Sequence, residues 1–573
     1  MTQFTPSPQR QSAGRVLVDA LALHGVQRVF CVPGESYLEV LDALYDAAGI
    51  EVVVTKHEGA AANMAEADGK LTGQPGICMV TRGPGATHAS IGVHVAQQDS
   101  TPMILFIGQI AREDKGRDVF QEVDYQQLFG HMAKLVIEID RAERMAELIA
   151  RAFHVAVSGR PGPVVVALPE DMLQEATDCP ACRATPLAPA AVDAATAQQV
   201  GQLLAQAQRP LLVLGGSGWT PQAHALLRTL VQRWQLPVAC SFRRQDLFDN
   251  RDPHFVGHLS LGMSPSVRAM VQQADVLLAL GTRLTDVSTG EYELLQVPRP
   301  QQTLVHCHPG ADELGRVYQA DVAIAAKPEA LLQALLDWDQ ASSAAAQPGN
   351  WGNWRGNWQG WLSQGRAGYE AFIGLGGTAP DGQIDGVDLR AVVQYLDREL
   401  PEDAILTNGA GNYAIWLHRF FRYRQPRTEL ASTCGAMGYG LPAAIAAALR
   451  HRQRQVVCFA GDGCFMMYPQ ELATAAECGA RLTVLLVNNG MYGTIRMHQA
   501  RRYPGRVSAT RLPSPDYCAM ARACGAHAEP VTRTEDFAAA WQRAQQSGRL
   551  ALIELRTDPL QITPDQRLSP ENA

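Results

Sequence analysis

The sequence predicts an α/β protein of three domains, each built on a doubly wound parallel sheet. Its 573 residues exceed what a single hydrophobic core usually holds, and they suggest roughly three domains of about 150–200 residues. One local pattern recurs along the chain: a short apolar run, then glycines, then a helix-like stretch. Two segments of different composition separate the regions that carry this pattern.

Several of the apolar runs end directly at glycines. They are residues 77–80 before Arg82-Gly83, residues 211–214 before Gly215-Gly216, residues 276–280 before Gly281, and residues 456–460 before Gly461. Continuous Val, Ile and Leu runs of this length are typical of strands covered on both faces, and alternation with helices indicates parallel sheets. Ligands of such sheets bind beyond the carboxyl ends of the strands, where these glycines lie.

Composition also predicts the domain boundaries. Residues 177–197 are rich in Ala, Pro and Thr, and residues 339–365 are rich in Ser, Ala, Gly and Asn, so both segments indicate linkers. We therefore expect the domains at residues 10–178, 195–338 and 366–560.

Four tryptophans in the second of these segments share one face of a predicted helix. They are Trp351, Trp354, Trp358 and Trp361. We expect this face to pack on a neighbouring domain or subunit, because a platform for nucleotide bases would need positive charge around it.

Composition excludes several classes of function. The chain has 49 Lys and Arg against 57 Asp and Glu, a net charge of −8, which argues against binding of nucleic acid. No apolar run is long enough to predict a membrane span, and residues 1–14 lack the apolar core of a signal peptide. The 12 cysteines are scattered, mostly inside apolar runs, as in a reduced protein. We expect a cytoplasmic protein without a nucleic-acid or membrane partner.

The sharpest motif is Gly-Asp-Gly at residues 461–463, followed by Asn489 after 25 intervening residues. Asp462 follows the apolar run 456–460, and Asn489 follows the run 482–487, so both belong to one βαβ unit whose strand ends lie side by side. A carboxylate and an amide oxygen suit magnesium, which takes further oxygens from phosphates and water. The glycines allow backbone N–H groups to approach a diphosphate closely.

This motif closely resembles the metal–diphosphate motif of the thiamine-diphosphate-dependent enzymes. The resemblance implies that Asp462, Asn489 and the backbone carbonyl of Met491 ligate magnesium. Residues 470–474, Gln-Glu-Leu-Ala-Thr, are similar to the catalytic large subunit of acetolactate synthase. The resemblance also implies a pyrimidine-binding N-terminal domain, a central domain, a diphosphate-binding C-terminal domain, and thiamine diphosphate and Mg²⁺ as cofactors.

Glu58 lies in a second segment of the resemblance, Lys56-His57-Glu58-Gly59, after the apolar run 52–55. A carboxylate that opens a helix can simply interact with the helix dipole. The segment resembles, however, the family's His-Glu stretch, whose Glu hydrogen-bonds the aminopyrimidine of thiamine diphosphate. Sharing a proton with that ring lets the cofactor's own amino group deprotonate the thiazolium carbon. We expect Glu58 to be this catalytic group.

Further segments extend the resemblance over most of the chain. Met437 matches the bulky residue beneath the bend of the cofactor, although a Met between glycines can also simply fill a gap in the core. Phe120 and Gln121 resemble residues that border the substrate in acetolactate synthases. The remaining cofactor contacts that the resemblance implies are Pro33, Gly34, Gly85, Ala410, Gly411, Asn412, Tyr413, Gly461, Gly463, Cys464, Tyr492 and Gly493.

Two interpretations of the central domain stay open. Acetolactate synthases often hold a non-reacting FAD there, partly through a Gly-x-Arg segment, and Gly281-Thr282-Arg283 keeps that arginine. Residues 284–287 depart from the usual pattern, and the glycine cluster at residues 215–218 is weak evidence for a dinucleotide. The domain either binds FAD or is structural and holds no ligand.

Two reactions are compatible with the resemblance. A carboligase of the acetolactate synthase type decarboxylates a 2-oxo acid, pyruvate, and transfers the two-carbon unit to a second 2-oxo acid. A 2-oxo acid decarboxylase, a lyase, instead releases an aldehyde, and it often uses histidines of the pyrimidine domain, for which His88 and His94 are candidates. Phe120 and Gln121 favour the carboligase.

Three further expectations follow from the resemblance. Met497 and His498 occupy the region where biosynthetic acetolactate synthases commonly carry a Trp, so the acceptor is left open. A non-catalytic member of the family would be expected to lose Glu58 or the metal ligands, all of which are present here. In the family the Glu and the metal site come from different subunits, so we expect a homodimer or a homotetramer.

Overall fold

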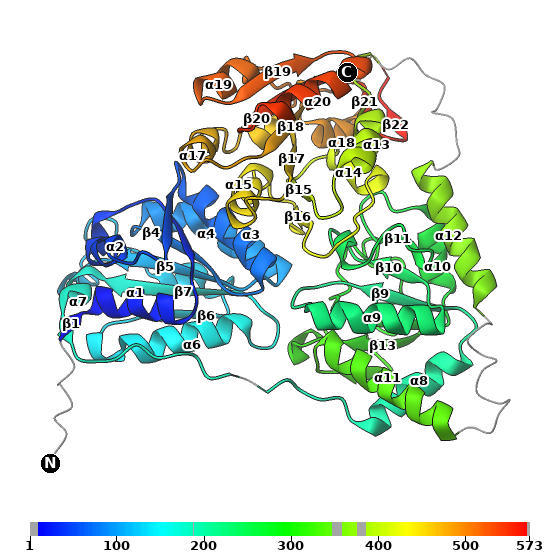
Figure 1. Cartoon of the computed structure of the whole chain (residues 1–573), viewed down its shortest axis with the longest axis horizontal. Coiled ribbons are helices and arrows are strands. Elements are labelled where there is room, and N and C mark those ends of the chain that lie inside the picture. Colours follow the sequence, from blue (N-terminus) through cyan, green and yellow to red (C-terminus); the bar gives the residue numbers. More distant parts are fainter. Residues whose placement is uncertain (1–9, 187, 346–357, 375–384, 570–573) are drawn as a thin grey trace.

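The computed structural model describes residues 10–186, 188–345, 358–374 and 385–569. Over these residues the chain forms three α/β units, each around a six-stranded sheet in which every paired strand is parallel. Figure 1 shows the N-terminal unit in blue and cyan, the central unit in green, and the C-terminal unit in yellow to red. The predicted fold class is confirmed.

The N-terminal sheet has the strand order β3-β2-β4-β5-β7-β6. Its strands are β2 (Arg28–Cys31), β3 (Glu51–Val54), β4 (Gly76–Val80), β5 (Met103–Gln109), β6 (Leu135–Glu138) and β7 (Pro163–Pro169). Its helices are α1 (Ala13–Leu23), α2 (Leu38–Tyr45), α3 (Glu58–Thr72), α4 (Pro84–Asp99), α5 (Tyr125–Phe129), α6 (Met145–Val157) and α7 (Glu170–Gln174). Helices α1, α2 and α6 share a core on one face, whereas α3 and α4 cover the other face. A short antiparallel pair, β1 (Gln11–Ser12) with β8 (Ala176–Thr177), joins the two ends of this unit.

The C-terminal sheet repeats this topology, with the order β16-β15-β17-β18-β20-β19. Its strands are β15 (Ile405–Asn408), β16 (Glu429–Ala431), β17 (Val456–Gly461), β18 (Thr483–Asn488), β19 (His527–Val531) and β20 (Ala551–Arg556). Its helices are α13 (Leu389–Glu399), α14 (Ala414–Phe420), α15 (Gly440–Arg450), α16 (Asp462–Phe465), α17 (Glu471–Glu477), α18 (Gly493–Arg502), α19 (Tyr517–Ala523) and α20 (Phe537–Gln546). A short hairpin, β21 (Gln561–Thr563) and β22 (Gln566–Arg567), follows β20.

The central sheet has a different order, β11-β10-β9-β12-β13-β14. Counted along the chain this is 3-2-1-4-5-6, the order of dinucleotide-binding domains. Its strands are β9 (Pro210–Leu214), β10 (Val238–Cys240), β11 (Phe255–His258), β12 (Val276–Leu280), β13 (Thr303–Cys307) and β14 (Val322–Ile324). Its helices are α8 (Ala194–Gln206), α9 (Pro221–Trp234), α10 (Pro265–Gln273), α11 (Pro328–Ala345) and α12 (Gln359–Ile373).

Two of the four tryptophans lie at the start of helix α12, and the structure shows how they pack. Trp358 precedes the helix, is fully buried, and donates from Nε1 to the carbonyl of Ala207 at 2.9 Å. Trp361 donates from Nε1 to the carbonyl of Pro210 at 3.0 Å. Both indoles therefore pack on the central domain, as expected, while Trp351 and Trp354 lie outside the described residues.

The second segment of different composition contains more helix than its sequence suggests. Helix α11 runs on to Ala345, past the predicted end of the central domain at residue 338. The predicted start of the C-terminal domain, residue 366, falls inside α12, which packs on β11 and α10 of the central unit. Small and polar residues at 339–345 lower the hydrophobicity of α11 without ending it, which is why composition alone places the break too early.

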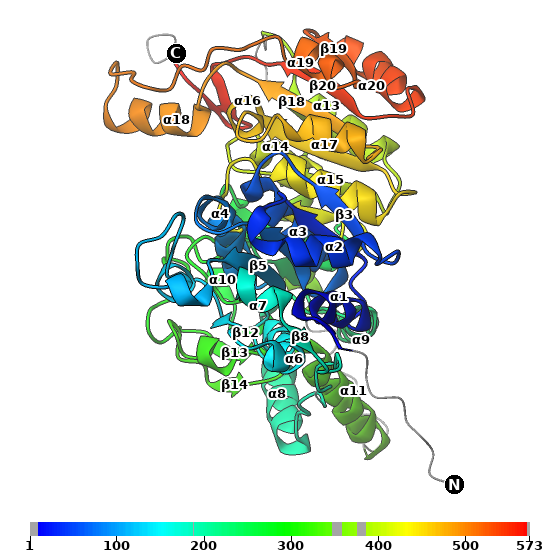
Figure 2. The same ribbon diagram turned by 90° about the vertical axis from the view of Figure 1, so that its left-hand side faces the viewer.

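The N-terminal and C-terminal units meet through α3 and α15, which lie side by side in both views (Figures 1 and 2). Both helices are rich in Ala and Gly, so their axes can approach closely. At their contact the Tyr439 hydroxyl donates to Glu66 at 2.6 Å, and Arg450 binds both carboxylate oxygens of Asp68 at 2.7 and 2.6 Å.

The described part of the chain contains no helix that is both long enough and apolar enough to cross a membrane.

Replacing Trp358 by Ala should destabilise the central unit. Removing a fully buried indole and its hydrogen bond leaves a cavity, and such changes lower the free energy of unfolding by about 3–5 kcal/mol. Chemical unfolding followed by circular dichroism would measure this loss. Tyr45→Ala is the matched control, because that ring is 91% exposed. Equal stability of the two variants would contradict the packing described for Trp358.

Candidate active site

The predicted site residues gather where the strand order of each outer sheet reverses. In the N-terminal sheet β3 lies to one side of β2 and β4 to the other, and in the C-terminal sheet β16 and β17 flank β15 in the same way. Loops that leave such neighbouring strands separate toward opposite faces of the sheet and open a crevice between them, which is where ligands of these sheets bind.

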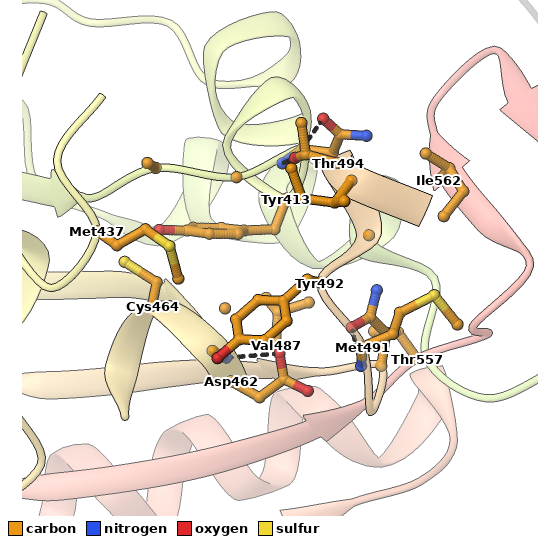
Figure 3. A pocket seen from close by; sticks show the side chains of 18 of the residues that line it. Tyr413, Met437, Asp462, Cys464, Val487, Met491, Tyr492, Thr494, Thr557 and Ile562 are labelled. Atoms are coloured by element: carbon orange, nitrogen blue, oxygen red, sulfur yellow. Dashed lines mark hydrogen bonds between the residues drawn. The ribbon is translucent and has the colours of Figure 1, made fainter. Parts of the chain in front are cut away.

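A cavity of about 260 Å³ lies at the reversal point of the C-terminal sheet. All the predicted site residues of this domain line it: Ala410, Gly411, Asn412, Tyr413, Met437, Gly461, Asp462, Gly463, Cys464, Asn489, Met491, Tyr492 and Gly493. They come from the loops after β15, β16, β17 and β18, and Figure 3 shows Met437 and Cys464 on one side, Tyr492 and Asp462 in the middle, and Met491 on the other side.

Asp462 is the first residue of α16, directly after β17, and is only 3% exposed. Its carboxylate accepts hydrogen bonds from the backbone N–H groups of Gly463 and Gly490, both at 2.8 Å. Burial raises the pKa of Asp462 to about 6, and the backbone hydrogen bonds only partly oppose this shift. Among the described residues, no Lys, Arg or His forms an ion pair with Asp462. A buried carboxylate in this state suits a bound divalent cation.

The two asparagines of the motif point in different directions. Asn488 donates from Nδ2 to Glu554 at 2.7 Å, so its side chain is part of the sheet scaffold. Asn489 lines the cavity and accepts a hydrogen bond from the N–H of Met491 at 3.2 Å. Asp462, Asn489 and Met491 therefore surround one space, and their oxygen atoms are of the kind that magnesium prefers.

Two tyrosine rings leave no room for a side chain at Gly461 and Gly463. A Cβ added at Gly461 would lie 2.6 Å from the ring of Tyr413, and one added at Gly463 would lie 2.6 Å from the ring of Tyr492. The hydroxyl of Tyr413 accepts a hydrogen bond from the N–H of Gly409 at 3.1 Å, which fixes this ring along the cavity wall. Larger residues at the two glycines would close the cavity.

Met437 lines the cavity and also packs on the core of the C-terminal unit. The next residue, Gly438, donates from its N–H to Sγ of Cys464 at 3.1 Å, so the loop before α15 is tied to the Gly-Asp-Gly turn. Its φ of +84° and the nearby Tyr468 ring both favour glycine at that position.

The reversal point of the N-terminal sheet holds a second group of predicted residues. Pro33 and Gly34 follow β2, and a Cβ at Gly34 would lie 2.4 Å from Thr81 beyond β4. Glu58 is the first residue of α3, and its side chain is 15% exposed. Its Oε2 lies 2.9 Å from Nδ1 of His88, whereas Oε1 faces Gly85, where an added Cβ would lie 3.7 Å away.

Phe120 and Gln121 lie in the loop between β5 and α5 on the same unit. The ring of Phe120 is 73% exposed. Gln121 has a φ of +65°, and its backbone packs against Gly83, just after β4. The predicted substrate residues thus lie near the carboxyl end of β4.

The structure divides the predicted site into these two groups. None of the N-terminal residues, Pro33, Gly34, Glu58, Gly85, Phe120 or Gln121, lines the cavity that Asp462 and Asn489 share. Sequence analysis named His88 as a candidate but did not pair it with Glu58, because the two residues lie on different helices and no spacing rule connects them. His498 lies exposed on α18, and Met497 Sδ accepts from Asn412 Nδ2 at 3.6 Å.

The glycine segments of the central sheet lie at its own reversal point, between β9 and β12. They pack directly on each other: a Cβ at Gly216 would lie 2.0 Å from the carbonyl oxygen of Gly281. Arg283 is largely buried, and it donates to the carbonyl of Gln98 at 2.7 Å. Close packing of two loops explains these glycines without a ligand, and FAD stays a prediction.

Three six-stranded parallel sheets with these strand orders define a three-domain α/β architecture. Models of the thiamine pyrophosphate enzymes match all three units: the N-terminal TPP binding domain over residues 11–128, the central domain over residues 197–335, and the C-terminal TPP binding domain over residues 409–555. Thiamine pyrophosphate is thiamine diphosphate under another name. The chain belongs to the thiamine pyrophosphate enzyme family.

Similar proteins match over nearly the whole chain. An acetolactate synthase large subunit of Parasynechococcus marenigrum is 34% identical over 562 residues, covering 94% of this chain and 86% of that protein. The acetolactate synthase isozyme 2 large subunit of Escherichia coli is 31% identical over 553 residues, covering 95% of each chain. The isozyme 3 large subunit of the same organism is 29% identical, with 96% of each covered.

The raised pKa of Asp462 predicts a pH-dependent affinity for Mg²⁺. A metal ion bound to the carboxylate would have to displace a proton below pH 6, because the pKa of Asp462 is raised to about 6. We expect the apparent affinity to be constant above about pH 7 and to fall toward tenfold per pH unit below about pH 6. Isothermal titration calorimetry with thiamine diphosphate present would measure it.

The control for this prediction is Asp462→Asn, which should bind Mg²⁺ weakly at every pH and lose the dependence. An affinity of the unaltered protein that stays flat between pH 5 and pH 7 would contradict the assignment of Asp462.

Proposed function

We propose that this protein is a thiamine-diphosphate- and Mg²⁺-dependent carboligase of the acetolactate synthase type. It decarboxylates pyruvate and transfers the two-carbon unit to a second 2-oxo acid. The observation that carries the proposal is the pair of strand-end groups, a largely buried Glu58 on one sheet and Asp462 with Asn489 on another. The names of the full-length relatives support the type of reaction.

Each group has a distinct role in the proposal. Asp462, Asn489 and the carbonyl of Met491 hold Mg²⁺, while the loops at Gly411 and Gly463 present backbone N–H groups to the diphosphate. Met437, which lines the same cavity, would contact the cofactor from the core side of the cavity. Glu58 exchanges a proton with the pyrimidine ring. When bound, thiamine diphosphate supplies the electron sink for decarboxylation.

We further propose a homodimer as the smallest active unit, with a homotetramer as the larger alternative. The cavity of one subunit would face the Glu58 group of its partner. Two observations support this: the N-terminal residues do not line the cavity of their own chain, and the apolar ring of Phe120 is exposed. Partner contact would bury this ring beside the substrate. FAD in the central domain remains a separate proposal, and no step of the reaction depends on it.

The alternative function is a 2-oxo acid decarboxylase that releases an aldehyde. The observation that favours it is the imidazole of His88 at hydrogen-bond distance from Glu58, since a histidine in this place could deliver a proton to the product.

A proton NMR time course with thiamine diphosphate, Mg²⁺ and pyruvate tests the reaction, and Glu58→Gln tests the mechanism. We expect acetolactate to accumulate, and we expect Glu58→Gln to slow its formation by at least about 100-fold with the fold unchanged. Glu113→Gln, an exposed carboxylate of the same domain, is the control. Acetaldehyde would identify the decarboxylase, and untouched pyruvate would move the search to larger 2-oxo acids. Full turnover in Glu58→Gln would refute the mechanism.

Mixed dimers test whether the two groups come from different subunits. Glu58→Gln and Asp462→Asn, each inactive alone, would be co-expressed and purified through two different tags. Purification through both tags selects the mixed dimers, each of which has one intact site of two, so we expect roughly half of the full activity. If Glu58 and Asp462 of the same chain formed each site, no mixed dimer would contain an intact site, and activity would stay at the level of the single variants.

A further inference from the structure

We propose that His88 is a positioning residue for Glu58: its Nδ1–H binds Oε2 and leaves Oε1 free to face the space beside Gly85. The inference rests on the proposed function only in giving Glu58 a reaction to perform. It gives His88 a role other than that of the proton donor considered for a decarboxylase.

The two oxygens of the Glu58 carboxyl group have different surroundings. Nδ1 of His88 lies 2.9 Å from Oε2; the side chain of Glu58 is 15% exposed and that of His88 is 52% exposed in the single chain. Oε1 faces Gly85, where an added Cβ would lie 3.7 Å from Oε1 and 3.0 Å from the side chain of Thr81, so a glycine keeps side-chain atoms away from this oxygen. The bond thus fixes the rotation of the carboxyl group and presents one oxygen at the reversal point of the sheet.

The packing of α3 against α4 holds the two residues at this distance. Ala62 follows Glu58 by one helical turn, and Gly92 follows His88 by one turn. A Cβ at Gly92 would lie 2.4 Å from Cβ of Ala62, so the helices touch one turn away from the hydrogen bond. This close contact fixes the spacing of the two helix backbones from which His88 and Glu58 project.

His57 supports the imidazole of His88 from its other side. The two rings stack with centroids 4.7 Å apart, and the ring of Tyr468 lies 5.2 Å from His57. Nδ1 of His57 accepts the N–H of Gly59 at 2.9 Å, as the cap of α3. Burial, with His88 nearby, lowers the pKa of His57, so its ring is neutral and carries its proton on Nε2.

The proton on Nε2 of His57 argues against a different use of the same cluster. His57, Glu58 and His88 place one nitrogen or oxygen each within 4.8 Å of one another, a spacing that a transition metal could bridge. A metal needs a free lone pair on each histidine, and on His57 one nitrogen accepts the helix N–H while the other is protonated. The cluster is therefore organised around hydrogen bonds to Glu58.

The test compares His88→Ala with His88→Asn. The amide of Asn can place a donor close to the position of Nδ1, whereas Ala removes the donor. In enzyme loaded with thiamine diphosphate and Mg²⁺, exchange of the thiazolium proton into D₂O reports the work of Glu58 without any 2-oxo acid. We expect Ala to slow this exchange, and kcat, by about 10–100-fold, with KM for the cofactor within about threefold. Asn should restore most of the rate.

Two comparisons separate positioning from a structural effect. His131→Ala removes an exposed imidazole of the same domain and should change nothing. Combined with Glu58→Gln, His88→Ala should cost no further rate, because a residue that acts through Glu58 has nothing left to position. In cofactor-free protein with ¹⁵N-labelled histidine, the Nδ1–H resonance of His88 should shift on Glu58→Gln.

Each outcome has one meaning. Unchanged exchange in His88→Ala overturns the proposal, and so does equal loss in His88→Ala and His88→Asn, which would indicate titration of the imidazole instead of its hydrogen bond. If the Nδ1–H resonance of His88 does not shift on Glu58→Gln, the proposal is overturned as well. Exchange in Glu58→Gln as fast as in the unaltered protein would instead overturn the proposed function, whatever His88 does.

Discussion

The contact between α3 and α15 is the constraint on which the arrangement of the rest depends. Glu58 is the first residue of α3, and Met437 lies in the loop that leads into α15, so the packing of these helices sets where both loops lie. At the contact Glu66 is fully buried and accepts from Tyr439 and Thr101, both at 2.6 Å.

Lys70, one turn beyond Glu66, balances the buried charge of this contact. Burial acts to lower the pKa of Lys70, but the carboxylates of Asp99 and Glu66 outweigh it and raise the pKa. Lys70 also donates to the carbonyl of Ala431 at 3.1 Å, which ties the network to the end of β16. Buried groups of this kind are costly unless every partner is in place, so the network specifies one way for the two domains to meet.

The shared topology of the outer sheets explains why the site comes in two groups. In both sheets the strand order reverses between the first and the third strand along the chain, so each sheet has one crevice of its own. The central domain has a different strand order, yet it also contacts this region: Arg243 donates to the carbonyl of Gly409 at 2.7 Å and to Ser432. The loop after β15 is therefore held by a second domain of the same chain.

Local sequence predicted the features that one βαβ unit determines. Asp462 and Asn489 follow neighbouring strands, and parallel pairing alone brings them together, so the cavity residues of the C-terminal domain lie where the motif places them. Contacts between elements that are distant in the sequence were not predictable in this way. Glu58 with His88, Glu66 with Tyr439 and Arg243 with Gly409 join residues from 30 to more than 370 positions apart, and only the packing of helices and domains decides them. The tryptophan spacing predicted a helix that overlaps the start of α12, but not its extent to Ile373 or the partners of its indoles on the central unit.

The proposed carboligase and its alternative differ in what meets the reacting carbon after decarboxylation. A proton gives an aldehyde, and a second 2-oxo acid gives a new carbon–carbon bond. Apolar walls that exclude water favour the second outcome, because they remove the commonest proton source. Phe120 on the N-terminal unit and Ile495 on α18 are apolar side chains exposed in the single chain. If the proposed dimer brings both side chains to the entrance of one site, dimer formation would both bring Glu58 to the metal-binding cavity and exclude water from it. Carboligation would then depend on assembly twice, once for the catalytic carboxylate and once for the exclusion of water.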